Sequence, residues 1–259
     1  MTKTLKISVL ALGLAYLSGA ATADVMIGLA DDRQIVYDSQ WKSTNAYNDK
    51  NWYLRLGVGA QTIQRAGEFV FRLPEAVDEN LTFTSAEFRV QLLSKTGAEN
   101  SSVGPNPVPN FNLDLYAVRI ADAPTVLTSD FYAGERDSNA ILIMDNFITP
   151  DSPIRVSGNP NYITTDNEAN ERLTAFLNEA YAKGANAGKY IFLRLSPDYT
   201  TVTADMVNMN YSVLAGDAGN AAERPTITYT TVIPEPMTMG LVPLVGAMML
   251  MPRRRAPQR

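Results

Sequence analysis

Four aromatic residues lie in and beside a polar loop, where their rings could stack on sugars: Trp41, Tyr47, Trp52 and Tyr53. The loop from 38 to 51 also supplies Asn, Asp and Lys side chains that can hydrogen-bond sugar hydroxyls. Exposed rings bind the apolar face of a sugar, while a few polar groups fix its orientation. The same rings can instead pack beneath the loop as core. The cluster therefore predicts either a carbohydrate-binding surface or ordinary packing, and exposure of the rings decides between the two.

Calcium is the one cofactor for which the sequence offers candidate ligands, because calcium prefers carboxylate and carbonyl oxygens. Asp31 and Asp32 are adjacent and form one candidate. Asp166-Asn167-Glu168 is similar to the start of a calcium loop, but position 171 is Glu where such a loop has Gly. Negative charge at a helix N-terminus is the alternative interpretation of this second cluster.

The composition excludes several kinds of catalysis. The chain has no Cys and no His, which removes disulfides, thiolate nucleophiles, Ser-His-Asp triads and the common zinc sites. Asp-Ser pairs begin at Asp38, Asp137 and Asp151, but none continues to the Gly of an aspartic-protease motif. Paired carboxylates from distant strands can still act on glycans. We therefore expect a non-enzymatic protein, with a carboxylate-dependent glycan-acting enzyme as an alternative.

The elements that must position these residues are mainly β. Short stretches of alternating or apolar residues predict nine strands: 34–37, 53–58, 68–73, 83–92, 111–120, 140–148, 189–195, 209–214 and 225–232. In 83–92 the apolar side chains face one way and the polar ones the other, as in an antiparallel sheet with one covered face. Phe88 and Leu115 lie midway along such strands, so we expect both in the core.

One amphipathic helix interrupts the strands. Thr165 and Glu168 are spaced as a capping box, apolar residues recur at helical spacing as far as Tyr181, and Gly184 supplies a C-terminal stop. Nine strands and one helix predict an antiparallel β-sandwich of jelly-roll type. With no repeat and no internal linker, residues 24–232 form a single domain in this interpretation.

The N-terminus has the three parts of a secretory signal peptide. Lys3 and Lys6 make a basic start, 7–17 is apolar, and Ala21 and Ala23 form an A-x-A cleavage site before Asp24. Signal peptidase is therefore a predicted partner. Residues 1–23 are the predicted signal peptide, and the mature protein begins at Asp24.

The C-terminus carries a second set of signals. Prolines hold Glu235 in an extended segment, an apolar run from 237 to 251 is too short to span a bilayer well, and three arginines follow. These residues are Pro234, Glu235, Pro236, Arg253, Arg254 and Arg255. The order resembles the PEP-CTERM sorting tail of exported bacterial proteins. The resemblance implies that 233–259 associates transiently with the inner membrane of a Gram-negative-type bacterium and is removed by an exosortase-like enzyme.

Five segments of the mature region have a familiar order: 54–59, 68–73, 84–90, 190–193 and 223–229. In these segments the region is similar to DNRLRE-type β-sandwich modules of bacterial surface proteins. Arg72 departs from the family, which usually has Asp after the Phe. Some such modules bind carbohydrate, so the resemblance implies a cell-surface location and offers exopolysaccharide as a partner.

The charge of residues 24–232 limits the partners further. The chain has 22 basic and 27 acidic residues, of which six basic residues and Glu235 lie outside this region, leaving 16 and 26 and a net charge of −10. Such a domain has no electrostatic footprint for nucleic acid. We expect an exported surface or extracellular-matrix protein with a structural or adhesive domain, and a carbohydrate-binding module as the alternative.

Processing at both ends gives the first testable prediction. Native protein should begin near Asp24 and lack the arginine tail, because both terminal segments carry removable signals. Intact-mass analysis of material from its own host checks this expectation. Finding Lys3 or Arg254 in the mature protein would contradict it.

Overall fold

The structure, a computed structural model, describes residues 21–38, 40, 43–47, 53–59, 63–76, 78–96, 109–132, 136–156, 161–198 and 208–233. These residues are mainly β with a single α-helix, which confirms the predicted fold class. The strands are β1 (Thr22–Ile27), β2 (Arg33–Asp38), β3 (Ser43–Tyr47), β4 (Tyr53–Val58), β5 (Ile63–Arg72), β6 (Thr82–Thr96), β7 (Leu113–Ala121), β8 (Ile141–Ile148), β9 (Tyr162–Thr164), β10 (Tyr190–Pro197), β11 (Asn210–Leu214) and β12 (Thr226–Val232). The helix is α1 (Asn167–Tyr181), and η1 (Thr128–Asp130), η2 (Ala182–Gly184) and η4 (Ala221–Glu223) are 3-10 turns.

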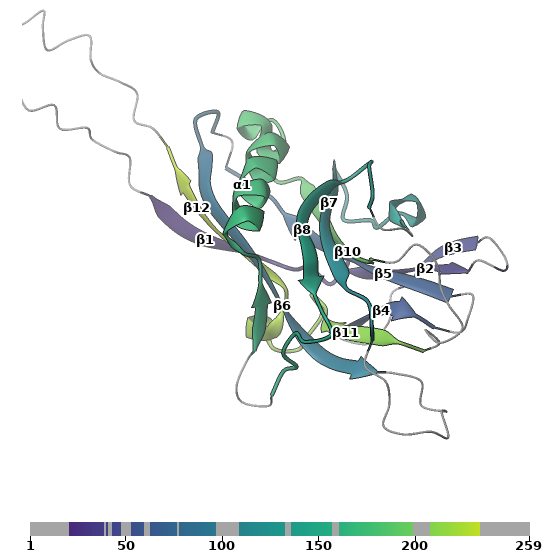
Figure 1. The fold of residues 1–259 in the computed structure, drawn as a ribbon. Helices are drawn as coiled ribbons and strands as arrows, with labels where there is room; N and C mark the ends of the chain where they lie inside the picture. The colour runs from purple at the N-terminus through teal and green to yellow at the C-terminus, as the bar shows by residue number, and fades with distance from the viewer. Residues whose placement is uncertain are drawn as a thin grey trace, which may run out of the picture.

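The strands form one strongly curled antiparallel sheet (Figure 1). Its order is β1-β12-β6-β11-β4-β5-β10-β7-β8, with β2 paired to β5 and β3, and β9 paired to β6. The 15-residue β6 pairs with β12 over its first half and with β11 near its end. Because β6 belongs to both parts of the sheet, it carries the chain around the core and closes the sandwich on one side.

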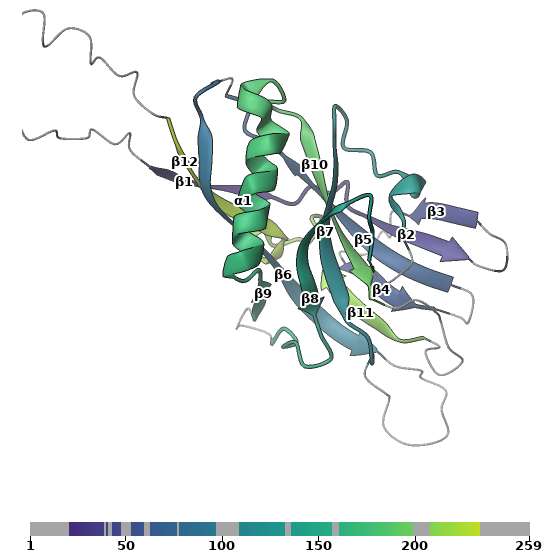
Figure 2. The same ribbon diagram turned by 45° about the horizontal axis from the view of Figure 1, so that its top comes forward.

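Helix α1 closes the opposite side, lying between β6 and β8 (Figure 2). Its buried residues follow the predicted helical spacing: Ala169, Leu173, Phe176, Leu177, Ala180 and Tyr181. The Asn178 side chain accepts from the backbone N–H of Phe83 and donates to its carbonyl, both at 2.9 Å, which fixes the helix to β6. The Arg172 guanidinium donates to the Ile143 carbonyl at 2.8 Å and makes the corresponding link to β8.

The main core lies between the two halves of the sheet and the helix. Phe88 is fully buried at its centre, with ring centroids of Phe69, Phe71 and Phe147 within 6.0 Å of its own. Leu115 is also fully buried. The predictions that Phe88 and Leu115 belong to the core are therefore confirmed.

The outer face of β5 and β10 is buried as well, which the sequence pattern did not indicate. Val70 and Phe192 are fully buried on this face beneath Ile35 of β2 and Val126 of the connection after β7. The rings of Tyr37 and Phe131 stack with centroids 5.4 Å apart and close the same layer. Polar residues on this face are consequently removed from water.

Three strands and the helix cap differ from the prediction. β1, β3 and β9 were not predicted, because they are short and lack an alternation of large apolar residues. The helix is capped by Asp166, whose Oδ1 accepts from the Ala169 N–H at 2.8 Å, so the predicted Thr165–Glu168 capping box is wrong. Thr165 is instead a buried partner of β6, accepting from the Phe88 N–H at 3.0 Å.

The core gives a second prediction. Phe88→Ala should lower the free energy of unfolding by about 3–5 kcal/mol, because the site is completely enclosed and leaves a cavity. Glu87→Ala, on the opposite face of the same strand, should change it by less than about 1 kcal/mol. Denaturant unfolding of both variants measures the difference, and a similar small loss in both would place the core elsewhere.

Candidate functional site

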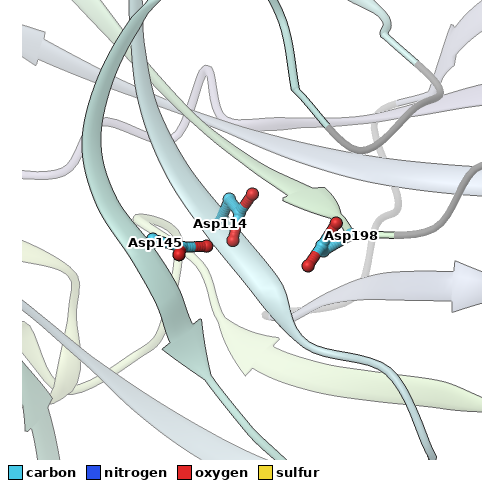
Figure 3. Close-up of side chains that lie close together, drawn as sticks. All are labelled: Asp114, Asp145 and Asp198. Carbon is cyan, nitrogen blue, oxygen red and sulfur yellow. The ribbon is translucent and has the colours of Figure 1, made fainter.

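Three aspartates from different parts of the chain meet at one end of the sheet: Asp114 of β7, Asp145 of β8 and Asp198 just after β10. One carboxylate oxygen from each lies within 4.8 Å of the other two. Figure 3 shows Asp145 and Asp198 on either side of Asp114. Asp114 is buried, Asp198 is half-buried and Asp145 is exposed, so the group reaches from the protein interior to solvent.

A bulge in β8 turns Asp145 towards Asp114. Residues Leu113 and Leu115 of β7 lie opposite Ile148 and Met144, so β8 has two more residues than β7 between these pairs. Asn146 accommodates them with a φ of 55°, in the left-handed region that Asn tolerates better than most residues. Its N–H donates to Asp114 Oδ1 at 2.8 Å. Bulges often redirect side chains at functional sites.

Asn112 connects β8 to the residue that follows β10. Its side-chain amide donates to the Asn146 side-chain carbonyl, and its backbone carbonyl accepts from the Asp198 N–H at 2.9 Å. The segments that carry the three carboxylates are thus held together by backbone and amide hydrogen bonds. Their mutual approach is built into the fold.

The cluster is electrostatically unfavourable without a counter-charge. The pKa of Asp114 is raised to about 7, chiefly by burial and also by repulsion from Asp198 and Asp145 and a hydrogen bond with Asp145, while the Asn146 N–H opposes the shift. The Tyr116 hydroxyl donates to Asp114 Oδ2 at 3.3 Å. Burial, with the nearby Asp114 charge, raises the pKa of Tyr116 to about 12, so this hydroxyl keeps its proton at neutral pH.

A depression of about 340 Å³ lies over the cluster. Tyr116, Arg136 and Leu142 line it together with the three aspartates. The depression gives a small ion or polar ligand direct access to the carboxylates from solvent.

The spacing of the oxygens suits a hard cation. Calcium binds oxygen ligands at about 2.3–2.6 Å, so two ligands of one ion lie at most about 5.2 Å apart. The three aspartates satisfy this limit. Glycosidases hold their two carboxyl groups about 5–5.5 Å apart or more. The spacing of these oxygens is therefore compatible with cation binding.

The predicted aromatic cluster is only partly within the described residues. Trp41 and Trp52 lie outside them, and Tyr47 belongs to β3 without a described side chain. Tyr53 begins β4 half-buried, where its hydroxyl accepts from the Arg55 guanidinium at 2.9 Å. The carbohydrate platform remains a prediction.

The predicted calcium candidates have other contacts in the structure. Asp32 is buried, and its two oxygens accept from the N–H groups of Val70 and Gly216, each at 2.7 Å. Burial raises the pKa of Asp32 well above its usual range, against these two bonds. Asp32 thus ties β5 to the turn after β11, while Asp31 is half-buried in the preceding turn. Asp166 is the helix cap, in agreement with the alternative interpretation of that cluster.

The predicted processing signals lie at or beyond the edge of the described residues. Ala21 is exposed, whereas Ala23 and Asp24 lie within β1, opposite Thr230 and Tyr229 of β12. Cleavage before Asp24 would leave the last four residues of β1 paired with β12. The sorting residues Pro234, Glu235, Pro236, Arg253, Arg254 and Arg255 are outside the described residues. Within the described ranges, no helix has the length and apolar character needed to cross a membrane.

Comparison with known proteins gave no relative: no family model matches the chain, and no curated protein matches it. Function must therefore be argued from the site and the sequence signals.

The sequence analysis did not identify the three aspartates as a site. Asp114 belongs to a strand predicted from its alternation, which does not show that its polar face is covered, and Asp145-Asn146 was the sole polar interruption in 141–148. An Asp-Asn pair within an apolar strand is a usable signal for a bulge. Nothing in the sequence relates Asp198 to the other two.

The site gives a third prediction. In cation-free protein, Asp145→Asn should lower the pKa of Asp114, because Asp145 raises it through its charge and its hydrogen bond. The folded pKa of Asp114 exceeds the model-peptide value of 3.8, so its contribution to stability is lost as pH rises from about 4 to 7. This loss should be smaller in the variant. Titration of the Asp114 carboxyl by ¹³C NMR in chelator checks it, with the exposed Asp151→Asn as control. Equal titration midpoints of Asp114 in the wild type and in both variants would contradict the expected coupling between Asp114 and Asp145.

Proposed function

We propose that this chain is an exported cell-surface or extracellular-matrix protein, without enzymatic activity, whose β-sandwich domain binds calcium at Asp114, Asp145 and Asp198. The observation that supports the calcium site is the convergence of three carboxylates in a solvent-accessible depression. Three negative charges so close together are costly unless a cation neutralises them or one carboxyl takes up a proton. Carboxylate oxygens on a bulged, open strand end also suit the flexible coordination that calcium accepts.

The sequence signals support the location. A signal peptide and a PEP-CTERM-like tail imply export, with signal peptidase and an exosortase-like enzyme as processing partners and transient contact with the inner membrane. The described domain brings the start of β1 and the end of β12 side by side, as the pairing of Thr22 with Thr231 records (Figure 1). Both removable segments therefore leave from one corner, and the cation site is on other strands.

A calcium ion at this site would serve the structural or adhesive role that we propose. It would join β7, β8 and the end of β10 at an end of the sheet where three like charges otherwise repel one another. Extracellular calcium modules commonly bind with dissociation constants of about 0.1–1 mM. The site would then be occupied in a calcium-containing medium and empty where calcium is scarce.

Carbohydrate binding is a second candidate, favoured by the space above the cluster. The depression of about 340 Å³ leaves room for sugar hydroxyls to complete the coordination of a bound cation. Exopolysaccharide would then bind to the protein through the calcium ion. The positive charge of the ion would also offset the repulsion between a polyanionic glycan and the acidic domain.

Calcium titration is the test of the proposed function and gives the fourth prediction. At 10 mM calcium, a dissociation constant of about 0.1–1 mM stabilises the folded protein by about 1.4–2.7 kcal/mol. Asp145→Asn and Asp198→Asn should abolish this gain, whereas the exposed Asp151→Asn should retain it. Isothermal titration with calcium chloride and thermal unfolding in calcium or chelator measure both quantities.

Three outcomes distinguish the candidate functions from one another. Failure of calcium to bind or stabilise at 10 mM would contradict the cation site. A glycan array probed in calcium and in chelator distinguishes a sugar-binding role from a structural one, because only the former gives calcium-dependent glycan signals that Asp145→Asn removes. Turnover of any bound glycan would instead favour the glycan-acting enzyme.

A further inference from the structure

A second polar cluster lies on the outer face of β5 and β10, beneath residues 121–132, which we term the covering segment. Its apolar contacts are with the layer that contains Val70 and Phe192. Glu68 of β5 and Arg194 of β10 are cross-strand neighbours under this segment, and both are almost fully buried. Ionisable groups rarely occupy such a position without a partner.

Two arginines hold the covering segment on the sheet. Arg119 of β7 donates to Asp130 Oδ2 at 2.8 Å and to the Thr125 carbonyl at 2.5 Å. Arg194 donates to the Asp130 carbonyl and, at 2.6 Å, to Asp137 Oδ2. Asp130 also accepts from the Leu127 N–H at 3.1 Å. Asp130 is thus the residue through which both arginines bind the segment.

The Glu68 side chain makes no hydrogen bond of this kind to the described residues. Its exposed fraction is 0%, and neither carboxylate oxygen accepts a hydrogen bond from the described residues. The Asp130 carboxyl acts on Glu68 through its charge and a side-chain hydrogen bond, and both effects raise the pKa of Glu68. Two ionised carboxylates cannot bond to each other, so this contact forms only when one of them carries a proton.

The charged groups around Glu68 come from every neighbouring element. Arg33 lies opposite it on β2, but its guanidinium donates to the Ala30 and Asp32 carbonyls. Among the residues that the structure describes, the other ionisable groups of this cluster are Arg119 and Tyr116 of β7, Arg194 of β10, Asp130 of η1, and Tyr132 and Asp137 beyond it.

Charge balance identifies the group that carries the proton. Under the covering segment, Arg119 and Arg194 face three carboxyls, Glu68, Asp130 and Asp137. Asp130 and Asp137 each have an ion pair with an arginine, at 2.8 and 2.6 Å. The cluster is neutral when Glu68 is protonated, and it has one excess buried negative charge when Glu68 is ionised. An uncompensated buried charge is strongly destabilising.

We propose that Glu68 is a proton-dependent latch for the covering segment. With its proton, Glu68 donates a hydrogen bond to Asp130 and leaves the two arginine pairs balanced. Without it, a third carboxylate competes for Arg119 and Arg194, and the segment is released from the sheet. The latch uses other carboxyls than the calcium site, and Tyr116 contacts both clusters, because its hydroxyl donates to Asp114 and accepts from the Asp137 N–H.

The direction of the pH effect follows from burial. Burial raises the pKa of Glu68 well above its usual range, Asp130 raises it further, and Arg119 and Arg194 oppose the shift. The unfolded chain therefore loses this proton at a lower pH than the folded protein. The stability that Glu68 contributes is complete below about pH 4.3 and is lost as pH rises through the folded pKa.

Comparison of the full mature chain with its Glu68→Gln variant tests the latch and is the fifth prediction. Gln has nearly the same shape, stays neutral and can donate to Asp130. Above about pH 4.3, the unfolding constant of the wild type should rise about tenfold per pH unit relative to E68Q, until the folded pKa is passed. Urea unfolding across pH 4–9 measures this ratio, and the exposed Glu79→Gln is the matched control.

Hydrogen exchange tests the release itself. At high pH the Leu127 amide should exchange faster in the wild type than in E68Q measured at the same pH. For amides in the β6 core, the ratio of the wild-type exchange rate to the E68Q exchange rate should stay near one. Parallel stability curves for wild type and E68Q would overturn the proposal, as would a variant that loses stability with rising pH more steeply than the wild type. If E68Q does not fold, ¹³C titration of Glu68 in the wild type decides, and an ordinary glutamate pKa overturns the latch.

Discussion

The double burial of β5 and β10 is the constraint on which much of this structure depends. Their inner residues, such as Phe69 and Leu193, join the main core, while Val70 and Phe192 are covered on the outer face. An antiparallel sheet commonly leaves one face wet. Here the connection after β7 and strand β2 cover that face, so the polar residues placed on it must find partners or change protonation state.

The burial of this face has different consequences for the cluster of three aspartates and for the cluster around Glu68. At the open end of the sheet, Asp114 is buried but Asp145 and Asp198 extend towards solvent, so a cation can reach the excess charge. Beneath the covering segment, Glu68 is shut away from solvent, and only a proton can neutralise it. Access to solvent therefore separates a candidate metal site from a candidate protonation switch within one polar layer.

Local backbone irregularity gives the first cluster its shape. The bulge in β8 and the left-handed Asn146 bring Asp145 over Asp114, and Asn112 connects both to the end of β10. A regular β8 would have continued the alternation and pointed Asp145 elsewhere. This cluster lies on β7, β8 and the end of β10, whereas β1 and β12 bring the two ends of the described domain together.

The sequence by itself determined the β-rich architecture, the burial of Phe88 and Leu115, and the span of the helix, because alternation and helical spacing are local patterns. It missed β3 and β9, whose few residues become strands only when β2 and β6 offer them an edge. It did not indicate that Asp114 and Glu68 are buried, because alternation shows which residues share a face but not what covers it. Only the tertiary structure decided that Asp114, Asp145 and Asp198 meet, since strand order and a bulge join segments that are far apart in the chain.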